Sequence, residues 1–396
     1  MELLRKIYEM TAIGDLIASP GSILMIIISF FLLYLGIKKQ YEPLLLVPIA
    51  FGVLLANFPG GAMGVVEIEE GETLLDIAKH HGIMNFIYYS LIKTGFLPPI
   101  IFMGVGALTD FGPMLKNLRL AFFGAAAQIG IFSVLITAVS MGFTLKEAAA
   151  LGIIGGADGP TAIYTTIKLA PHLLGPIAIA AYSYMALVPV IIPLIVKFTM
   201  TKSELQINMK KQDKLFPPNK EIKNIQTVKI LFPIALGTIV SILVPSSVPL
   251  VGMLLFGNLV KEIGTSTNRL FEAASGTIMN AATIFLGLSV GATMTATAFL
   301  NQQTIMIVVG GFIAFAISIA GGIFAVKIYN LFAKKKINPL IGATGLSAVP
   351  MASRVANEIA LKHDPSNHLL QYAMASNISG VIGSAVAAGV LISFLG

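Results

Sequence analysis

The sequence predicts an all-α polytopic membrane protein with two inverted-topology repeats, each of about five spans plus one broken re-entrant hairpin. Three observations lead to this fold class. First, 56% of the 396 residues are hydrophobic and only 11% are charged, which is more apolar sequence than a water-soluble core needs. Second, apolar runs long enough to cross a bilayer recur along the chain. Third, Gly and Pro interrupt two stretches that occupy corresponding positions in the two halves.

Composition also excludes several classes of function. The chain has no Cys, which excludes disulfides, iron–sulfur ligation and thiolate chemistry. Its five His lack the spacing of a transition-metal site. The net charge of +7 could suggest nucleic acid, but the lysines cluster in short loops between apolar segments, where they anchor spans on the cytoplasmic side. We therefore expect a multi-pass protein of the cell membrane, with the lipid bilayer and not nucleic acid as its partner.

The predicted elements follow in chain order. The first repeat, residues 1–200, starts with an interfacial amphipathic segment up to residue 19. Its predicted spans cover residues 21–37, 43–58, 86–108, 118–141 and 174–200, and its broken stretch covers residues 147–169. A basic loop at residues 201–228 leads to the second repeat, residues 229–396. The predicted spans of that repeat cover residues 230–244, 249–263, 271–294, 304–332 and 369–395, and its broken stretch covers residues 337–355.

Loop charge predicts the orientation. Eight lysines lie between Lys197 and Lys229, both included, against three acidic residues, so this loop should be cytoplasmic. Residues 67–76 are acidic and should lie outside. Counting spans from these loops places the N-terminus outside, and the count closes only if the two broken stretches are re-entrant from opposite sides. This opposite polarity predicts the inverted repeat, and residues 101–104 (IFMG) and 284–287 (IFLG) add a weak sequence match.

Asp158 lies in the first broken stretch, within the string Gly155-Gly156-Ala157-Asp158-Gly159-Pro160-Thr161. A carboxylate in a bilayer costs roughly 2.5–3.5 kcal/mol even on the insertion scale, and such groups are usually functional. The glycines and the proline break the helix, and non-helical backbone at membrane depth persists only where protein covers it or a watery cavity solvates it. We therefore expect an ion or substrate site here, with a buried structural Asp as the alternative.

The second broken stretch, residues 338–347 (NPLIGATGLS), offers amide and hydroxyl oxygens. Asn338 and Ser347, together with backbone carbonyls freed near Gly342, are the hard ligands that Na⁺ or water prefers. The alternative is a turn rich in small residues for close helix packing. Arg354 follows near the predicted cytoplasmic edge, where a guanidinium suits a carboxylate and a snorkelling anchor is the alternative.

Two further polar side chains lie inside predicted spans. Tyr184 could relay a proton or donate a hydrogen bond to a ligand, although packing is the commoner role of an isolated intramembrane Tyr. Asn377 in the last span is a further possible oxygen ligand, with an interhelical hydrogen bond as the alternative.

These residues belong to longer strings that resemble a known family. The strings are residues 41–46 (YEPLLL), 104–113 (GVGALTDFGP), 155–161 (GGADGPT), 168–176 (KLAPHLLGP), 181–189 (AYSYMALVP) and 338–354. Over essentially its whole length, the chain resembles the β subunit of the biotin-dependent, sodium-translocating decarboxylases, which act on oxaloacetate, methylmalonyl-CoA, glutaconyl-CoA or malonate. One departure is visible at Asn377, which follows Ser376 where relatives typically have Gly-Pro, so a helix break at this position is left open.

The resemblance implies both residues and partners. The family's essential Asp and Tyr correspond to Asp158 and Tyr184, and its Asn, Gly, Ser and Arg correspond to Asn338, Gly342, Ser347 and Arg354. The implied partners are a carboxyltransferase subunit, a biotin-carrier subunit, a small membrane subunit and further copies of this chain. Carboxybiotin on the carrier would be decarboxylated at this chain, which consumes a proton and drives Na⁺ outward.

From the resemblance and the residues together we expect Asp158, Ser347, Asn338 and Asn377 around Na⁺. We expect Tyr184 to deliver a proton and Arg354 to bind the carboxylate of carboxybiotin. A secondary Na⁺-coupled carboxylate symporter is the rival from another class, because it would share inverted repeats and broken helices. A purely structural membrane anchor is the third alternative, and it predicts that Asp158 is dispensable.

Overall fold

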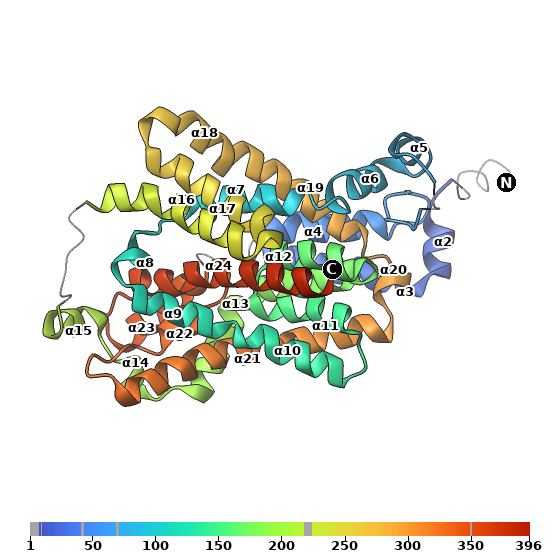
Figure 1. Ribbon diagram of the computed structural model, residues 1–396. Coiled ribbons are helices and arrows are strands. Elements are labelled where there is room, and N and C mark those ends of the chain that lie inside the picture. The colour runs from blue at the N-terminus through green and yellow to red at the C-terminus, as the bar shows by residue number, and fades with distance from the viewer. Residues whose placement is uncertain (1–7, 9, 41–42, 69–70, 218–223, 349–350) are drawn as a thin grey trace.

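The computed structural model describes residues 8, 10–40, 43–68, 71–217, 224–348 and 351–396. These residues form helices joined by short loops, with no strand among them (Figure 1). Seven helices are long and apolar enough to cross a membrane, or up to nine if each of two bent helix pairs is one span. These findings confirm an all-α multi-pass membrane protein. The predicted segment at residues 1–19 lies partly outside the described residues, and its described part includes the short helix α2, Ile13–Ala18.

The bounds of the elements are as follows. The first half contains α3 (Pro20–Ile37), α4 (Pro43–Ala56), α5 (Leu74–His80), α6 (Gly82–Ile87), η1 (Tyr88–Ile92), α7 (Leu97–Leu108), α8 (Gly112–Lys116), α9 (Leu118–Ala127), α10 (Ile129–Ser140), α11 (Leu145–Gly152), η2 (Ile153–Gly156), α12 (Gly159–Leu169), η3 (Pro171–Leu173) and α13 (Leu174–Thr199). The connecting loop contains α14 (Lys202–Leu205) and α15 (Met209–Leu215). The second half contains α16 (Ile225–Leu243), η4 (Pro245–Ser247), α17 (Val248–Ile263), η5 (Thr265–Thr267), α18 (Asn268–Glu272), η6 (Ala273–Ile278), α19 (Met279–Ala292), α20 (Ala296–Phe299), α21 (Gln302–Phe332), α22 (Leu340–Ala343), α23 (Met351–His363) and α24 (Leu370–Leu395).

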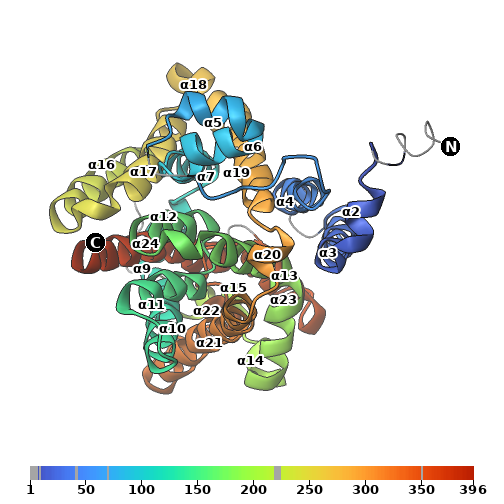
Figure 2. The same cartoon turned by 90° about the vertical axis from the view of Figure 1, so that its right-hand side faces the viewer.

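The helices form two packed groups, and each group mixes the two halves of the chain. One group contains α3, α4 and α7 from the first half and α16, α17 and α19 from the second. The other contains α9, α10, α11 and α13 from the first half and α21, α22 and α23 from the second. Helices α12 and α24 lie between the groups and contact both of them (Figures 1 and 2).

The packing partners come in matching pairs across the two halves. Helix α4 packs on α19 as α17 packs on α7, and α3 packs on α4 as α16 packs on α17. The second group and the two helices between the groups repeat this pairing: α13 packs on α21 as α24 packs on α9, and α12 packs on α13 as α23 packs on α24. Two repeats related by an internal two-fold axis would give this pattern, which is in keeping with the predicted inverted repeat.

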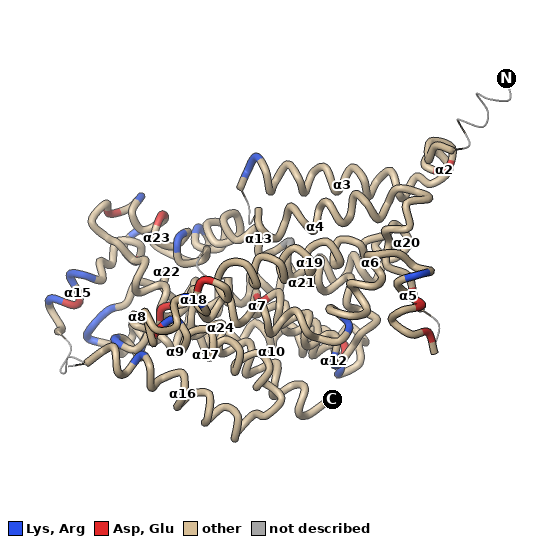
Figure 3. Tube along the Cα trace, turned by 90° about the horizontal axis from the view of Figure 1, so that it is seen from above, with Lys and Arg blue, Asp and Glu red and all other residues tan. Residues whose placement is uncertain are grey.

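Lys and Arg residues gather at one end of the molecule, around α8, α15 and α23 (Figure 3). The loop helices there are tied to the turn before α24: the Asn208 amide donates to the Asp364 carboxylate at 3.0 Å. Hydrogen bonds from Asn208 and then Ser366 lower the pKa of the Asp364 carboxyl to about 2. By the positive-inside rule, the sequence predicts that this basic end faces the cytoplasm.

Three predicted elements differ from the structure. The predicted span at residues 86–108 is broken, because η1 and α7 meet at 68° where Gly95 has a φ of +78° and Pro98 and Pro99 begin a new helix. The predicted span at residues 174–200 bends by 66° between residues 182 and 187, just before Pro189 removes a helical hydrogen bond. The second broken stretch does not end at residue 355, because α23 continues to His363 with its charged residues on an exposed face.

Glycines let the paired helices cross at backbone distance. A Cβ added to Gly106 of α7 would lie 1.8 Å from the Leu254 carbonyl oxygen of α17, and one added to Gly257 would lie 1.9 Å from that of Met103. At the matching crossing of α4 and α19, a Cβ added to Gly52 would lie 2.3 Å from a carbonyl oxygen of α19, and one added to Gly291 would lie 2.1 Å from a carbonyl oxygen of α4. Close approach at small residues is how helices associate in a bilayer without a hydrophobic driving force.

This crossing predicts that Gly106→Ala destabilises the protein by about 1–3 kcal/mol, because the new methyl group must displace backbone. Gly310→Ala in α21 is the matched control, since nothing lies within 4 Å of a Cβ there. The measurement is the thermal unfolding midpoint of both variants in the same detergent. Equal midpoints for the two variants would contradict the proposed backbone contact.

Candidate functional site

The first broken stretch consists of α11, η2 and α12, is called the first hairpin below, and turns at Asp158. The 3₁₀ turn η2 ends at Gly156, Ala157 adopts a left-handed conformation with a φ of +54°, and Asp158 is the N-cap of α12. The Thr161 backbone N–H donates to Asp158 Oδ1 at 3.1 Å. This arrangement ends one helix and starts the next within a few residues, and it leaves the Asp158 side chain only 4% exposed.

The second broken stretch, which contains α22 and leads into α23, is called the second hairpin below and meets the first at this turn. The Ser347 backbone N–H donates to the Gly156 carbonyl oxygen at 3.0 Å. Ser347 Oγ lies 2.8 Å from Ser384 Oγ of α24, and Ser384 Oγ lies 2.7 Å from Asp158 Oδ2. A hydroxyl has one proton to donate, so when Ser384 donates to the carboxylate, Ser347 donates to Ser384. Both hairpins and α24 therefore converge on one carboxylate.

Ser384 was not among the residues predicted from the sequence. It lies seven residues, or two helical turns, after Asn377 and so on the same face of α24. That spacing was the available signal, but a Ser in a helix rich in small residues usually serves packing.

Asn377 is fully buried, and its amide nitrogen donates to the Leu346 carbonyl oxygen beside Ser347. Within the described part of the chain, its Oδ1 has no hydrogen-bond partner. Helix α24 runs without a break through this position. The departure from Gly-Pro before Asn377 thus coincides with a continuous helix.

Two further buried oxygens near the turn also lack a hydrogen-bond partner among the described residues, namely Gln128 Oε1 and Thr161 Oγ1. Gln128 separates α9 from α10, and its amide nitrogen donates to the carbonyl oxygens of Gly124 at 3.1 Å and Gly345 at 3.3 Å. A Cβ on Gly156 would lie 3.4 Å from Gln128 Oε1 and 3.2 Å from Ser384 Cβ. Gln128, Gly156 and Ser384 therefore share one small volume.

The other glycines predicted to matter lie at close contacts. A Cβ on Gly155 would lie 2.9 Å from the Gly130 carbonyl group, and one on Gly342 would lie 2.0 Å from the Gly322 carbonyl oxygen. A Cβ on Gly159 would lie 2.3 Å from the Tyr182 ring. Pro160 follows in the first turn of α12, where it needs no hydrogen-bond donor.

A cavity of about 130 Å³ adjoins Asp158 and Ser347. Its other walls come from α4, α7, α13, α19 and α24, including the polar side chains of Asn280 and Thr283. This volume holds several water molecules. The Asp158 carboxylate thus adjoins a small space between the two helix groups. Gln128, Asn377 and Ser384 do not line this space.

Comparison with known proteins assigns the family. Residues 21–395 match the model of the Na⁺-transporting oxaloacetate decarboxylase β subunit. The chain belongs to this β-subunit family. It is 47% identical to the methylmalonyl-CoA decarboxylase subunit β of Propionigenium modestum, over 95% of each chain. It is 43% identical to oxaloacetate decarboxylase β chain 2 of Salmonella typhimurium, over 100% of this chain and 99% of that one. The β subunit of Veillonella parvula methylmalonyl-CoA decarboxylase is 47% identical over 96% of this chain and 95% of its own.

This membership confirms the resemblance and favours a Na⁺-transporting decarboxylase subunit over a symporter. The β subunit is a multi-pass protein of the cell membrane, because its family transports Na⁺ and its helices are apolar and long enough to span. The described residues contain no group of three or more His, Cys, Asp or Glu that could hold a metal. Na⁺ does not require such a group, since coupling ions in transporters are bound by freed carbonyl and side-chain oxygens.

Two predicted residues of the β subunit lie away from the Asp158 carboxylate. Asn338 is fully buried, but its amide nitrogen donates to the carbonyl oxygens of Leu205 and Ile207, at 3.1 and 3.0 Å, and its oxygen accepts from the Leu340 N–H at 3.0 Å. It therefore anchors the second hairpin to the loop after α13. Arg354 lies one turn into α23 with its side chain exposed.

The two tyrosines of α13 differ in position. The Tyr184 hydroxyl donates to the Val308 carbonyl oxygen of α21, and its ring packs on Phe312 and Phe315. The Tyr182 ring packs on Gly159 beside Asp158, and its buried hydroxyl has no partner among the described residues. The bend in α13 follows Tyr182 directly, so it separates the two rings.

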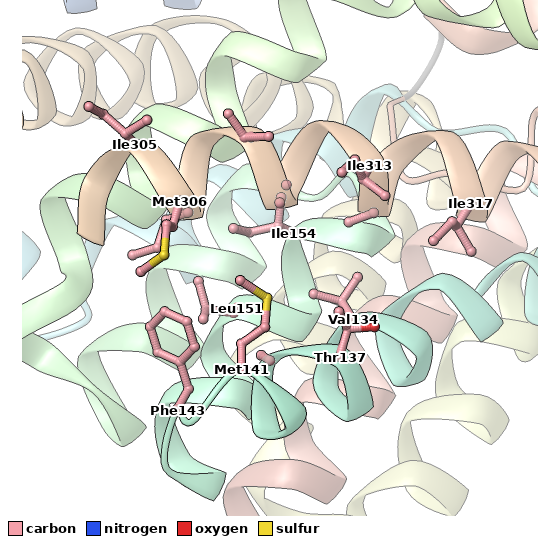
Figure 4. A pocket seen from close by; sticks show the side chains of 16 residues that line it. Val134, Thr137, Met141, Phe143, Leu151, Ile154, Ile305, Met306, Ile313 and Ile317 are labelled. Carbon is pink, nitrogen blue, oxygen red and sulfur yellow. The ribbon is translucent and has the colours of Figure 1, made fainter. Parts of the chain in front are cut away.

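An apolar groove of about 330 Å³ lies behind the first hairpin, between α10 and α21 (Figure 4). Ile154 and Leu151 form its inner wall, and the hydroxyl of its one polar side chain, Thr137, already donates to the Ser133 carbonyl oxygen at 2.8 Å. The groove cannot solvate an ion. It closes the site on this side with hydrocarbon.

The N-cap predicts how Asp158 substitutions affect folding. Asp158→Asn should keep an oxygen for the Thr161 N–H, because Asn caps helices as well as Asp does. Asp158→Ala should be less stable than Asp158→Asn by about 1 kcal/mol, because it removes the cap. Neither variant carries the charge, so the difference between their thermal midpoints in detergent reports the hydrogen bonds of the side chain, which are the cap and the bond to Ser384. A midpoint for Ala equal to that for Asn would show that the cap bond contributes nothing.

Proposed function

We propose that this β subunit decarboxylates carboxybiotin presented by a carrier domain and couples the reaction to Na⁺ export, with consumption of a proton. The observation that carries the proposal is the convergence of two broken hairpins and α24 on Asp158, through Ser347 and Ser384. A carboxylate and several neutral oxygens beside a helix break form the kind of ligand set that a transported hard cation needs.

We assign Asp158, Ser347 and Asn377 as Na⁺ ligands and add Ser384, which joins the first two. The Oδ1 of Asn377, which has no hydrogen-bond partner among the described residues, supports its inclusion, because a buried carbonyl oxygen without a partner is costly unless something binds it. Asn338 would join these ligands only if its three hydrogen bonds to backbone groups were exchanged. In the present conformation it positions the hairpin that carries Ser347.

The decarboxylation needs a proton donor and a positively charged side chain that binds the carboxylate. Cleavage of the N–CO₂ bond of carboxybiotin releases CO₂ and leaves a ring nitrogen that must take up a proton. We assign Arg354 to the carboxylate, because its fork suits two oxygens and its exposed side chain lies one turn from the start of α23. We assign proton delivery to Tyr184, which would have to leave the Val308 carbonyl, and the unpartnered Tyr182 hydroxyl is the neighbouring alternative.

The coupling requires partner subunits, since the carboxyl group must arrive on biotin. We infer a carboxyltransferase subunit, a biotin-carrier subunit and a small membrane subunit, together with further copies of this chain. The names of the relatives, which are subunits of decarboxylases for methylmalonyl-CoA or oxaloacetate, support such an assembly. The acid decarboxylated is set by the carboxyltransferase and not by this chain.

We predict that Asp158→Asn abolishes Na⁺-dependent decarboxylation by the intact complex while the complex still assembles. Loss of the charge removes most of the attraction for a cation that is leaving water, whereas the cap is kept. Asp158→Glu should fail as well, because one extra methylene displaces the carboxylate by about 1 Å, more than a preorganised site tolerates. Near-normal turnover with Na⁺ in either variant would remove Asp158 from the site and favour the structural-anchor interpretation.

The two ends of the reaction should respond to different substitutions. Ser347→Ala and Ser384→Ala should each raise the Na⁺ concentration for half-maximal decarboxylation by about tenfold, which corresponds to about 1.4 kcal/mol. Ser393→Ala, which removes an exposed hydroxyl further along α24, is the control and should change nothing. Arg354→Lys should instead raise the requirement for carboxylated carrier, because Lys keeps the charge but loses the fork. The measurement is two separate titrations, and equal shifts of one titration by Arg354→Lys and Ser347→Ala would contradict two separate sites.

A further inference from the structure

A further cavity, larger than both the cavity at Asp158 and the apolar groove, lies at the basic end of the molecule, away from Asp158. Its volume is about 930 Å³, within the range of sites that bind whole small molecules. Its walls come from the junction of α8 and α9, from α15 and the residues after it, and from the end of α21. It therefore lies where two spans reach the membrane surface.

Three cations at this cavity have no ion-pair partner within the described part of the chain. Lys116, Arg119 and Lys334 line the cavity, and all three are exposed. The one acidic residue in the lining, Asp213, is neutralised by Lys335 at 2.6 Å and accepts a hydrogen bond from the Tyr372 hydroxyl at 2.5 Å. The cavity consequently has an excess of positive charge that no residue in its lining balances.

The same cavity has exposed apolar walls. Phe332 at the end of α21 is 87% exposed, and Leu118 at the start of α9 is 64% exposed. Leu215 and Phe216 on the opposite wall are exposed as well. Cations and large apolar side chains thus share one concave surface at the level where a span leaves the hydrocarbon.

We propose that this cavity binds an anionic phospholipid of the cytoplasmic leaflet, with its phosphate at Lys116, Arg119 and Lys334 and its chains along Leu118 and Phe332. Basic pockets between spans on the cytoplasmic side bind anionic headgroups, and this end is cytoplasmic by the positive-inside rule. Arg119 suits a phosphate, because its fork donates two parallel hydrogen bonds. The proposal is independent of the Na⁺ site and of the decarboxylation.

An acidic partner protein is the competing occupant, and the structure favours the lipid for two reasons. Lys116 ends α8, Arg119 lies in the first turn of α9 and Lys334 lies just after the last residue of α21, so the cations lie at the ends of predicted spans, where a lipid headgroup would lie. The Phe332 side chain in the cavity wall is almost completely exposed, which suits contact with acyl chains. An acidic surface of a soluble protein would gain little from contact with such an apolar wall.

The test uses the intact complex, delipidated in a neutral detergent. Its ligands are dioleoyl phosphatidylglycerol, dioleoyl phosphatidylcholine with the same chains, and glycerol phosphate without chains. Native mass spectrometry counts the lipids retained, and the thermal midpoint reports stabilisation. We expect phosphatidylglycerol to bind at least tenfold more tightly than phosphatidylcholine, and glycerol phosphate to give no stabilisation at the same concentration.

The variant Lys116→Gln/Arg119→Gln/Lys334→Gln should lose this preference. The matched control is Lys38→Gln/Lys39→Gln/Lys202→Gln, which removes three exposed charges near the same membrane face but none from the cavity. Phe332→Ser should weaken phosphatidylglycerol binding without making phosphatidylcholine the preferred lipid. The Phe332 side chain is exposed, and the thermal midpoint without lipid controls for misfolding of this variant.

Four outcomes would overturn the proposal. Equal binding of the two lipids would exclude headgroup recognition, and an equal loss in the matched control would show that only general surface charge acts. Stabilisation by glycerol phosphate equal to that by phosphatidylglycerol would make this a site for a soluble anion. Retained lipid preference in the cavity variant, together with lost binding of the carrier subunit, would make the cavity a protein-docking site.

Discussion

The structure depends on burying one carboxyl group, that of Asp158, inside a membrane protein. A lone carboxylate at membrane depth costs several kcal/mol unless groups in the protein replace its water. At Asp158 the replacement comes from the Thr161 backbone N–H and the Ser384 hydroxyl, and the positive end of α12 adds to it. A continuous helix offers no free N–H groups, so the chain has to break there. The hairpin follows from the need to solvate Asp158.

Once the helices are broken, their loose ends must be covered by protein and not by lipid. The covering contacts are backbone to backbone, which only glycine permits. A Cβ on Gly322 would lie 2.1 Å from the Gly342 carbonyl oxygen, and one on Gly380 would lie 2.2 Å from that of Gly345. Both hairpins are therefore held by close contacts with neighbouring helices, and the glycines at these contacts are a consequence of the interrupted helices.

The sequence was sufficient for the membrane class, the broken stretches and the central carboxylate, because each leaves a strong local pattern. Asp158 among glycines in an apolar segment is rare enough to mark a site by itself. Ser384, Gln128 and Thr161 could not be found in this way, since small polar residues inside spans are common and their role depends on which helix lies opposite. Asn338 remains an untested ligand prediction: its residue type suits a ligand, but its hydrogen bonds in this structure go to backbone groups that no sequence pattern locates. The break at residues 93–97 had a visible cause in Gly95 and Pro98, which the long apolar run concealed.

The Ser384 hydroxyl has a second acceptor, because its Oγ lies 2.9 Å from the Val381 carbonyl oxygen as well as 2.7 Å from the Asp158 carboxylate. A rotation about one side-chain bond can therefore transfer the single O–H from one oxygen to the other. In one position the hydroxyl donates a hydrogen bond to the Asp158 carboxylate, and in the other it donates to the Val381 carbonyl oxygen, so that a lone pair of its oxygen can face a cation at the carboxylate. Neither position strands a buried donor, so the cost of exchanging a hydrogen bond for a cation is small in both directions. For the Na⁺ site proposed at Asp158, this exchange would let the ion leave as readily as it binds, which a pump requires and a storage site does not.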